Sequence, residues 1–310
     1  MKIIFMGTPL FGAKILESLL SCHEIVLVVT QPDKTVGRKK ELQASPVKQL
    51  AVRHQLKLFQ PHNCRQDNQM ILDTPADLIV TAAYGQFLPQ IVLNHPKQKS
   101  INVHGSLLPA YRGGAPVQRA IMNGDTITGI TIMYMASKMD AGDILYQEAI
   151  SIPNDKNADW LFDALGTLGA KLINPIIHQL ENNLLTPQKQ DEGKVTFAPI
   201  IKKEEEQLNF ACPAHQIYNQ IRGLASNPGA YFRFENEIFK VYQSKRMDRN
   251  HHQVPGTIIR ADKSGLLIAC ADESALLIEE LQPEGRKVMS FRDYYNGKGK
   301  YIFIENRRIL

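Results

Sequence analysis

The chain of 310 residues has little of what membrane, secreted or metal-binding proteins need. It contains no apolar run close to the ~18 residues that a membrane helix requires, and the run that follows Met1-Lys2 is too short for a secretory signal. Its four cysteines are scattered and form no CxxC pair: Cys22, Cys64, Cys212 and Cys270. We therefore expect reduced thiols in a cytoplasmic protein, with no membrane partner, disulfide framework or metal site.

The chain also lacks a large excess of charge of one sign. The 36 lysines and arginines stand against 31 aspartates and glutamates, for a net charge of +5, which excludes a histone-like coat for nucleic acid. Most of the excess falls in residues 207–310, which hold 15 basic and 11 acidic side chains. This imbalance fits a module that faces a polyanion. A chance imbalance on a solvated surface fits it equally well.

Continuous apolar runs alternate with amphipathic stretches in the first part of the chain. The runs predict buried strands at residues 3–6, 24–30, 78–83, 101–104 and 128–135. Helical spacing predicts helices at residues 11–20, 47–54 and 160–180. Such an alternation is typical of a parallel sheet that helices cover on both faces. We predict an α/β, Rossmann-like domain over residues 1–188, with ligands beyond the carboxyl ends of its strands.

The last third of the chain has a different pattern. Residues 189–206 are polar and charged, and we assign them to a linker. After a helix predicted at residues 213–222, short strands are predicted at residues 231–234, 238–242, 256–260, 265–269 and 275–281. Short strands at regular spacing predict a smaller β-barrel, of the OB type, over residues 207–310. A barrel of this type suits a basic module that binds nucleic acid.

The segment 100–116 holds the densest group of unusual residues. Side chains alternate between the two faces of a strand, so Ile101 and Val103 point to a core while Asn102 and His104 point the other way together. An amide and an imidazole on one face can polarise a carbonyl and hold an oxyanion. A buried pair bonded to the backbone explains these two residues equally well. The glycines and the apolar stretch that follow favour a ligand site, because they let a flat ring approach closely.

Two acids, Asp140 and Asp143, bracket a glycine turn after the strand predicted at residues 128–135. One of them can orient the histidine and stabilise its charged form. The alternative is a turn residue that caps its own backbone. Asp143 fits that alternative well, and spacing alone does not separate Asp140 from it.

Residues 31–50 form a long segment with a basic tip at Arg38, Lys39 and Lys40. The usual interpretation of such a segment is a solvated surface loop. Long basic loops on compact domains are also often functional, and this one can clamp phosphates.

Separate motifs along nearly the whole chain support a more specific interpretation. They are Phe5-Met-Gly-Thr-Pro, Gln31-Pro-Asp33, Ser45-Pro-Val-Lys48, Ala83-Tyr-Gly85, Asn102-Val-His104-Gly-Ser-Leu-Leu-Pro109, Arg112-Gly-Gly-Ala-Pro-Val-Gln-Arg119, Asp140-Ala-Gly-Asp-Ile and Pro255-Gly-Thr257. In this order the motifs resemble those of the formyltransferases that use 10-formyltetrahydrofolate. The resemblance extends to the branch of that family that formylates the α-amino group of methionine on initiator methionyl-tRNA, for translation initiation.

The resemblance implies roles for individual residues. It implies that Asn102, His104 and Asp140 are catalytic. It implies that the folate co-substrate contacts the turn after the histidine, at Ser106, Leu107, Leu108 and Pro109. It further implies that Arg38, Lys39 and Lys40 lie near the acceptor end of the tRNA and that residues 207–310 bind tRNA. No metal takes part in such a reaction, and we expect a monomer.

Three other functions compete with this one. A glycinamide ribonucleotide formyltransferase or a formyltetrahydrofolate hydrolase of the same superfamily shares the Asn–His–Asp chemistry but lacks a basic β-rich domain of about a hundred residues at its C-terminus. A non-catalytic RNA-binding protein accounts for residues 207–310 but leaves the polar face at Asn102 and His104 unexplained.

Overall fold

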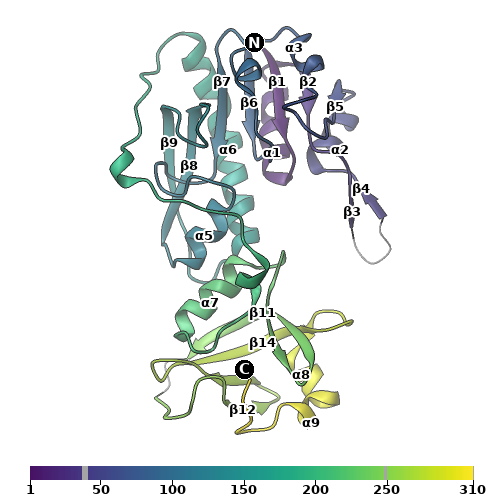
Figure 1. The fold of residues 1–310 in the computed structure, drawn as a ribbon, viewed down its shortest axis with the longest axis vertical. Helices are drawn as coiled ribbons and strands as arrows, with labels where there is room; N and C mark the ends of the chain where they lie inside the picture. The colour runs from purple at the N-terminus through teal and green to yellow at the C-terminus, as the bar shows by residue number, and fades with distance from the viewer. Residues whose placement is uncertain (37–40, 248–249, 310) are drawn as a thin grey trace. The chain divides into compact units, whose positions relative to one another are not determined.

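The computed structural model describes residues 1–36, 41–247 and 250–309 and divides into two units (Figure 1). The first unit consists of Met1–Pro116, Ile127–Ser151 and Trp160–Pro199. The second unit consists of Val117–Thr126, Ile152–Asp159 and Ile200–Leu310. Two short segments from the earlier part of the chain therefore belong to the second unit. The predicted domain boundaries, at residue 188 for the first domain and residue 207 for the second, stay predictions. Within the described ranges, no helix has both the length and the apolar character for crossing a membrane.

A seven-stranded sheet forms the centre of the first unit, in the order β5-β2-β1-β6-β7-β8-β9. Its strands are β1 (Lys2–Gly7), β2 (Glu24–Val29), β5 (Leu58–Phe59), β6 (Leu78–Ala82), β7 (Ser100–His104), β8 (Ile127–Tyr134) and β9 (Ile144–Ser151). The strands from β5 to β7 run parallel, whereas β8 and β9 pair antiparallel. The predicted α/β fold is confirmed, with a mixed sheet in place of a purely parallel one.

Apolar packing on both faces explains the continuous apolar runs of the inner strands. The helices of this part of the chain are α1 (Leu10–Leu20), α2 (Pro46–Arg53), α3 (Gln69–Leu72), α4 (Gln90–Leu93), α5 (Pro116–Met122) and α6 (Ala158–Glu181). Ile4 and Met6 of β1 share one core cluster with Val92 of α4. On the other face, Gly169 of α6 lies so close to Val103 of β7 that an added Cβ would be 3.2 Å from its side chain. Burial on both faces is what a parallel inner strand requires.

The segment predicted as a long basic loop contains a two-stranded antiparallel hairpin, β3 (Lys34–Val36) and β4 (Glu41–Gln43). The chain then enters α2, where the Ser45 side chain accepts a hydrogen bond from the backbone N–H of Lys48 and caps the helix. The basic tip at residues 38–40 lies outside the described residues.

The second unit is built on an antiparallel sheet in the order β10-β11-β14-β13-β12, with β15 paired to β14. Its elements are α7 (Ala214–Gly223), β10 (Ala230–Phe234), β11 (Glu237–Met247), β12 (Ile258–Asp262), β13 (Gly265–Ala269), β14 (Ala275–Pro283), β15 (Met289–Ser290), α8 (Phe291–Tyr294) and α9 (Lys300–Ile302). Inward-facing aromatic rings fill its core: Phe232 and Phe239 stack with centroids 5.3 Å apart, and Phe303 lies 5.2 Å from Phe239. The predicted β-rich C-terminal domain is confirmed as an antiparallel sheet, and its closure into an OB-type barrel stays a prediction.

An ion pair inside the second unit gives a pH-dependent prediction. Arg119 of α5 contacts both carboxylate oxygens of Glu205 at 2.5 and 3.0 Å, and this pairing lowers the pKa of Glu205 to about 2. A carboxylate whose pKa is lower in the folded state stabilises the fold fully at pH values above its ordinary pKa of 4.5. This stabilisation is lost as the pH falls from 4.5 toward 2. Because a third of Glu205 is exposed, we expect Arg119→Ala to reduce the free energy of unfolding at pH 7 by only about 1 kcal/mol.

Urea unfolding at pH 7, 5, 4 and 3 measures this contribution. The difference between the original chain and Arg119→Ala should shrink from pH 5 downward, because Glu205 becomes protonated in both. Glu205→Gln, which keeps the shape of the side chain, should show the same weakened pH dependence as Arg119→Ala. A difference in free energy of unfolding that stays constant from pH 7 to pH 3 would contradict a stabilising ion pair between Arg119 and Glu205.

Candidate active site

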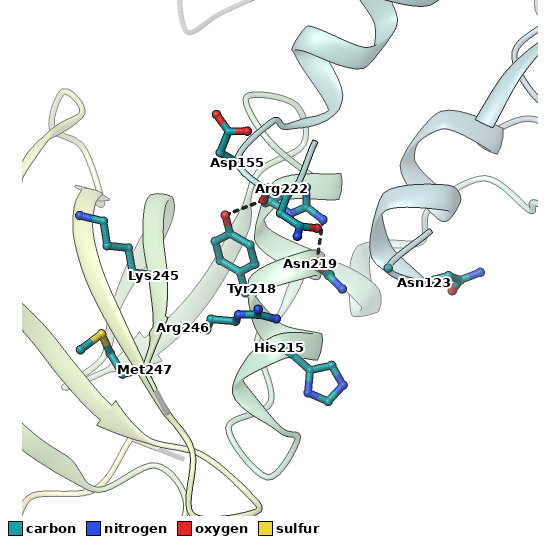
Figure 2. A pocket seen from close by; sticks show the side chains of 11 residues that line it. Asn123, Asp155, His215, Tyr218, Asn219, Arg222, Lys245, Arg246 and Met247 are labelled. Atoms are coloured by element: carbon teal, nitrogen blue, oxygen red, sulfur yellow. Dashed lines mark hydrogen bonds between the residues drawn. The ribbon is translucent and has the colours of Figure 1, made fainter. Parts of the chain in front are cut away.

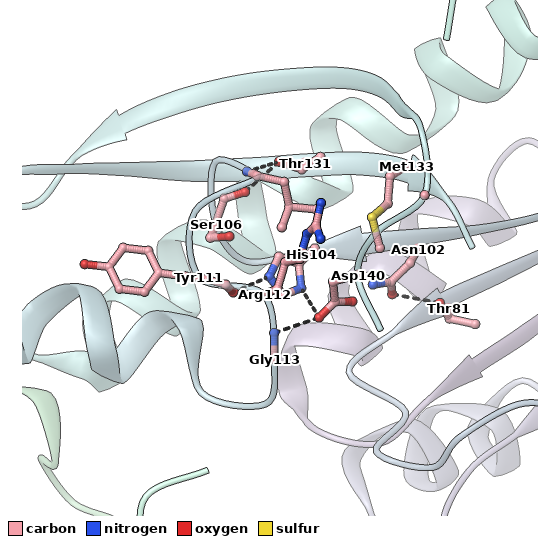
Figure 3. A network of polar contacts seen from close by, with 12 residues as sticks. Thr81, Asn102, His104, Ser106, Tyr111, Arg112, Gly113, Thr131, Met133 and Asp140 are labelled. Atoms are coloured by element: carbon pink, nitrogen blue, oxygen red, sulfur yellow. Dashed lines mark hydrogen bonds and ion pairs between the residues drawn. The ribbon is translucent and has the colours of Figure 1, made fainter. Parts of the chain in front are cut away.

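The amide of Asn102 is oriented by the neighbouring strand. Asn102 of β7 is in register with Thr81 of β6, and the Thr81 hydroxyl donates a 2.7 Å hydrogen bond to Asn102 Oδ1 (Figure 3). Because Oδ1 is the acceptor, Nδ2 is the end of the amide that carries the donors. Within the described residues Nδ2 makes no recorded hydrogen bond, so its N–H groups are available to a ligand.

The imidazole of His104, the last residue of β7, is fixed on both sides. Its Nε2 lies 3.0 Å from the backbone carbonyl oxygen of Tyr111, and a carbonyl only accepts, so Nε2 carries a hydrogen. Its Nδ1 lies 3.7 Å from Oδ2 of Asp140, and the two side chains are only 6% and 13% exposed. The ring therefore presents one known nitrogen, Nδ1, to a largely buried carboxylate.

Asp140 lies in the turn between β8 and β9, and its carboxylate points toward the imidazole of His104 (Figure 3). Its backbone adopts a left-handed conformation, with φ +49°, which is uncommon for a residue with a side chain. The carboxylate Oδ2 also accepts a 2.9 Å hydrogen bond from the backbone N–H of Gly113. Spacing could not separate Asp140 from a capping residue, but in the fold its side chain bonds to another segment and faces the imidazole. The three side chains predicted as catalytic thus belong to one region of the first unit.

Thr131 of β8 holds the turn that follows His104. Its hydroxyl donates to the Ser106 carbonyl at 2.7 Å and accepts from the Leu108 N–H at 3.1 Å. Gln147 of β9 donates to the Leu108 carbonyl and to the Thr131 hydroxyl, at 2.8 Å each. Of the four residues predicted to contact the folate, Ser106 and Leu108 are only 0% and 3% exposed, so they lie beneath the surface that a ligand can touch. The other two are partly exposed.

Gly113 allows a close approach that any other residue would prevent. Its φ is +130°, and an added Cβ would lie 2.6 Å from the carbonyl oxygen of Ala198. We expect Gly113→Ala to displace the N–H that bonds Asp140 and to lower turnover at least about tenfold. Gly297→Ala is the matched control, because a Cβ at Gly297 meets nothing within 4 Å. Steady-state rates of the two variants test this, and equal rates would contradict the role of Gly113.

A polar network around Arg112 was not predicted. The Arg112 side chain is 1% exposed, and its guanidinium donates to the side chains of Gln190 and Glu192. Hydrogen bonding to Arg112 lowers the pKa of Glu192 below its usual value. Both partners come from the polar segment that the sequence pattern assigned to a linker. Composition carries no signal for these contacts, because they depend on where the chain passes in three dimensions.

The second unit contains a basic pocket of about 510 Å³ (Figure 2). It is lined by Asn123, Gly124, Asn154, Asp155, His215, Tyr218, Asn219, Arg222, Lys245, Arg246 and Met247. The Arg222 guanidinium is 6% exposed and donates to the backbone carbonyls of Pro153 and Lys156 and to Asn219 Oδ1. The lining thus holds three cationic side chains, Arg222, Lys245 and Arg246, and one carboxylate, Asp155. Lys245 also pairs with Glu279 at 2.6 Å.

Comparison with known proteins identifies the class. The family model described as formyl transferase matches residues 1–177, and that described as formyl transferase, C-terminal domain, matches residues 200–299. The chain belongs to the formyl transferase family, which confirms the resemblance found in its motifs.

The relatives are more specific. Methionyl-tRNA formyltransferase of Staphylococcus epidermidis is 44% identical over 298 residues, which is 96% of each chain. That of Bacillus subtilis strain 168 is 43% identical over 299 residues, covering 96% of this chain and 94% of the relative. That of a Geobacillus species is 45% identical over 306 residues, 98% of this chain and 96% of the relative.

Solved structures share the fold at lower identity. The sugar 3N-formyl transferase WlaRD, crystallised in the presence of dTDP and 5-N-formyl-THF, has a TM-score of 0.70 at 18% identity, with 93% of this chain and 99% of WlaRD covered. An N-formyltransferase from Helicobacter canadensis, in complex with folinic acid and dTDP-3-aminofucose, has a TM-score of 0.69 at 18% identity, with 90% and 98% covered.

Proposed function

We propose that the chain transfers the formyl group of 10-formyltetrahydrofolate to the α-amino group of methionine on initiator methionyl-tRNA, in the cytoplasm, for translation initiation. The observation that carries this proposal is the 44% identity to a curated methionyl-tRNA formyltransferase over 96% of both chains. The geometry around His104 supplies the chemistry that such a transfer needs.

Asn102 and His104 act on the formyl oxygen. When the α-amine attacks the formyl carbon, a C–N bond forms and negative charge develops on that oxygen. Asn102 Nδ2 has free donors, and the 3.7 Å between His104 Nδ1 and Asp140 is longer than a hydrogen bond, so a protonated Nδ1 can donate to the oxygen. The bond from the formyl carbon to N10 of the folate then breaks, the amine loses one proton and N10 gains one.

Asp140 orients the imidazole, which lies 3.7 Å from its carboxylate. The carboxylate Oδ2 is itself fixed by the Gly113 N–H, and its negative charge faces the ring edge at which positive charge develops in the reaction. In this assignment Asn102, His104 and Asp140 are the catalytic residues. Loss of one donor to an oxyanion typically raises the barrier by about 3–4 kcal/mol.

The folate lies against the turn after His104. Leu107 and Pro109, which are partly exposed, contribute apolar side chains to this contact. Ser106 and Leu108 are buried and hold the shape of the turn through their bonds to Thr131 and Gln147. Support comes from two relatives of the same fold, whose structures were determined with a formyl-tetrahydrofolate or folinic acid.

The tRNA contacts residues 207–310 and the basic tip at residues 38–40. Support comes from the excess of basic side chains in residues 207–310 and from the basic pocket of the second unit. In this proposal residues 1–188 form the catalytic domain, residues 189–206 the linker and residues 207–310 the tRNA-binding domain of a monomer.

The basic tip gives a test of tRNA binding. Arg38→Ala should weaken tRNA binding and reduce the slope of log affinity against log salt by about 1, because one phosphate contact is lost. Arg38→Lys keeps the charge and should retain most of the slope. The test is to measure tRNA affinity between about 50 and 200 mM salt. An unchanged slope in Arg38→Ala would show that Arg38 does not contact the tRNA phosphates.

A direct assay separates the proposed activity from its rivals. The full chain is mixed with 10-formyltetrahydrofolate and offered methionyl-tRNA, glycinamide ribonucleotide or water alone as acceptor. We expect formylmethionyl-tRNA with the first acceptor and no comparable product with the other two. Formylated glycinamide ribonucleotide, or free formate in water, would assign the chain to another activity of the superfamily. Binding of tRNA without any product would indicate a non-catalytic protein.

A further inference from the structure

We propose that Gln190 and Arg112 are positioning residues, which fix the Asp140 carboxylate in front of the imidazole. The inference rests on the proposed function, since it gives these two side chains a task through Asp140. Neither of them bonds His104, Asn102 or the carboxylate of Asp140 in any recorded contact among the described residues. They act through the backbone of the turn that carries the acid.

The side-chain amide of Gln190 connects the arginine to that turn. Its Oε1 accepts from Arg112 Nε at 3.0 Å and from Arg112 Nη2 at 2.8 Å. Its Nε2 donates to the backbone carbonyls of Asp140, at 2.9 Å, and Gly142, at 2.8 Å. A guanidinium has only donors and a carbonyl has only acceptors, so the amide fits in this orientation and in no other.

Arg112 provides a fixed base for this amide. Its side chain is 1% exposed, its Nη2 also contacts Glu192 Oε1 at 2.8 Å, and its backbone pairs with Thr196 and Ala198 at 2.9 and 2.8 Å. A buried cation with this many partners has little freedom to move. The position of Gln190 is therefore set by the framework of the first unit.

Asp140 needs such support because its backbone is left-handed, with φ +49°. Gln190 holds the backbone carbonyl of Asp140, and the N–H of Gly113, the residue after Arg112, holds its carboxylate. The carbonyl of Tyr111, the residue before Arg112, holds the imidazole. Three consecutive residues thus set the relative placement of acid and histidine, and Gln190 completes the connection on the acid side.

A double-mutant cycle tests whether Gln190 acts through Asp140. Gln190→Ala should lower kcat about 10- to 100-fold, since small displacements of a catalytic group have effects of that size. The KM values for folate and tRNA should stay within about twofold. In an Asp140→Asn background, Gln190→Ala should lower kcat less than about twofold further. Gln188→Ala is the matched control, because the Gln188 side chain is exposed and its backbone alone pairs with Ile144.

A second variant, Gln190→Glu, separates an effect on the position of Asp140 from a general loss of stability. It keeps an acceptor for Arg112 and removes the donor to the two carbonyls, so we expect a kcat loss close to that of Gln190→Ala with a smaller drop in melting temperature. This inference would be overturned if Gln190→Ala lowered kcat by the same factor in the Asp140→Asn background as in the original chain. Unchanged kcat in both Gln190 variants would also overturn it. If Asp140→Asn alone keeps full activity, the catalytic assignment of the proposed function fails instead, so the two failures are distinguishable.

Discussion

Replacement of His104 by alanine is expected to lower kcat for formyl transfer by about 10³-fold or more, while the affinity for tRNA barely changes. In the proposed mechanism the imidazole supplies a donor to the developing oxyanion, and the Asp140 carboxylate lies 3.7 Å from it. Loss of one oxyanion donor alone accounts for about 10²–10³ in rate, and loss of a charge-balanced, oriented group adds to it. The tRNA affinity stays because a side chain that is 6% exposed offers no surface to a large polyanion.

Single-turnover formylation and a separate tRNA-binding titration measure these two quantities. His54→Ala is the matched control, since His54 is an exposed histidine of the same unit, at the end of α2. Thermal unfolding checks that the His104 variant is folded. Turnover of His104→Ala equal to that of the control would remove His104 from the reaction.

Asp140→Asn is expected to lower kcat by about 10²–10⁴-fold, the range typical of a residue that supports acid–base or charge stabilisation. Asparagine has the size of aspartate and can still accept the 2.9 Å hydrogen bond from Gly113. The turn should therefore keep its shape, and the loss reports the missing negative charge beside the imidazole.

Asp143→Asn is the matched control for this prediction. Asp143 lies in the same turn, and its backbone carbonyl accepts from the Tyr134 N–H at 3.0 Å. Its substitution should change the rate less than about twofold. If Asp143→Asn abolishes formylation and Asp140→Asn does not, the roles of the two acids are the reverse of those assigned.

Much of the fold follows from hydrophobic patterns, and its exceptions have physical reasons. The inner strands β1, β2 and β6 are buried on both faces, so each appears in the sequence as an unbroken apolar run. The edge strand β9 was not predicted. In the described part of the chain its outer side pairs with no further strand, apart from a single bridge between Ile144 and Gln188, and its residues alternate only weakly in burial. β11 extends five residues past the predicted end at 242, because its polar continuation pairs with β14 through irregular register.

The sequence predicted those residues of the candidate site that lie on one strand. It did not predict the residues that come to the site from other segments of the chain. The alternation of β7 placed Asn102 and His104 on one face, and the motif resemblance added Asp140. Thr81 and Gln190 have no such signal, because a threonine in an apolar strand and a glutamine in a polar segment are ordinary in sequence. Their contacts appear only when backbone carbonyls and side chains from distant segments are brought within 3 Å.

The most direct test of the central claim is a crystal structure of the chain with a formyl-bearing folate bound. The account predicts the formyl oxygen about 3 Å from both Asn102 Nδ2 and His104 Nδ1, with the Asp140 carboxylate still held by the Gly113 N–H. A formyl group bound away from these two nitrogens, or an imidazole that must leave the Tyr111 carbonyl to reach it, would contradict the account.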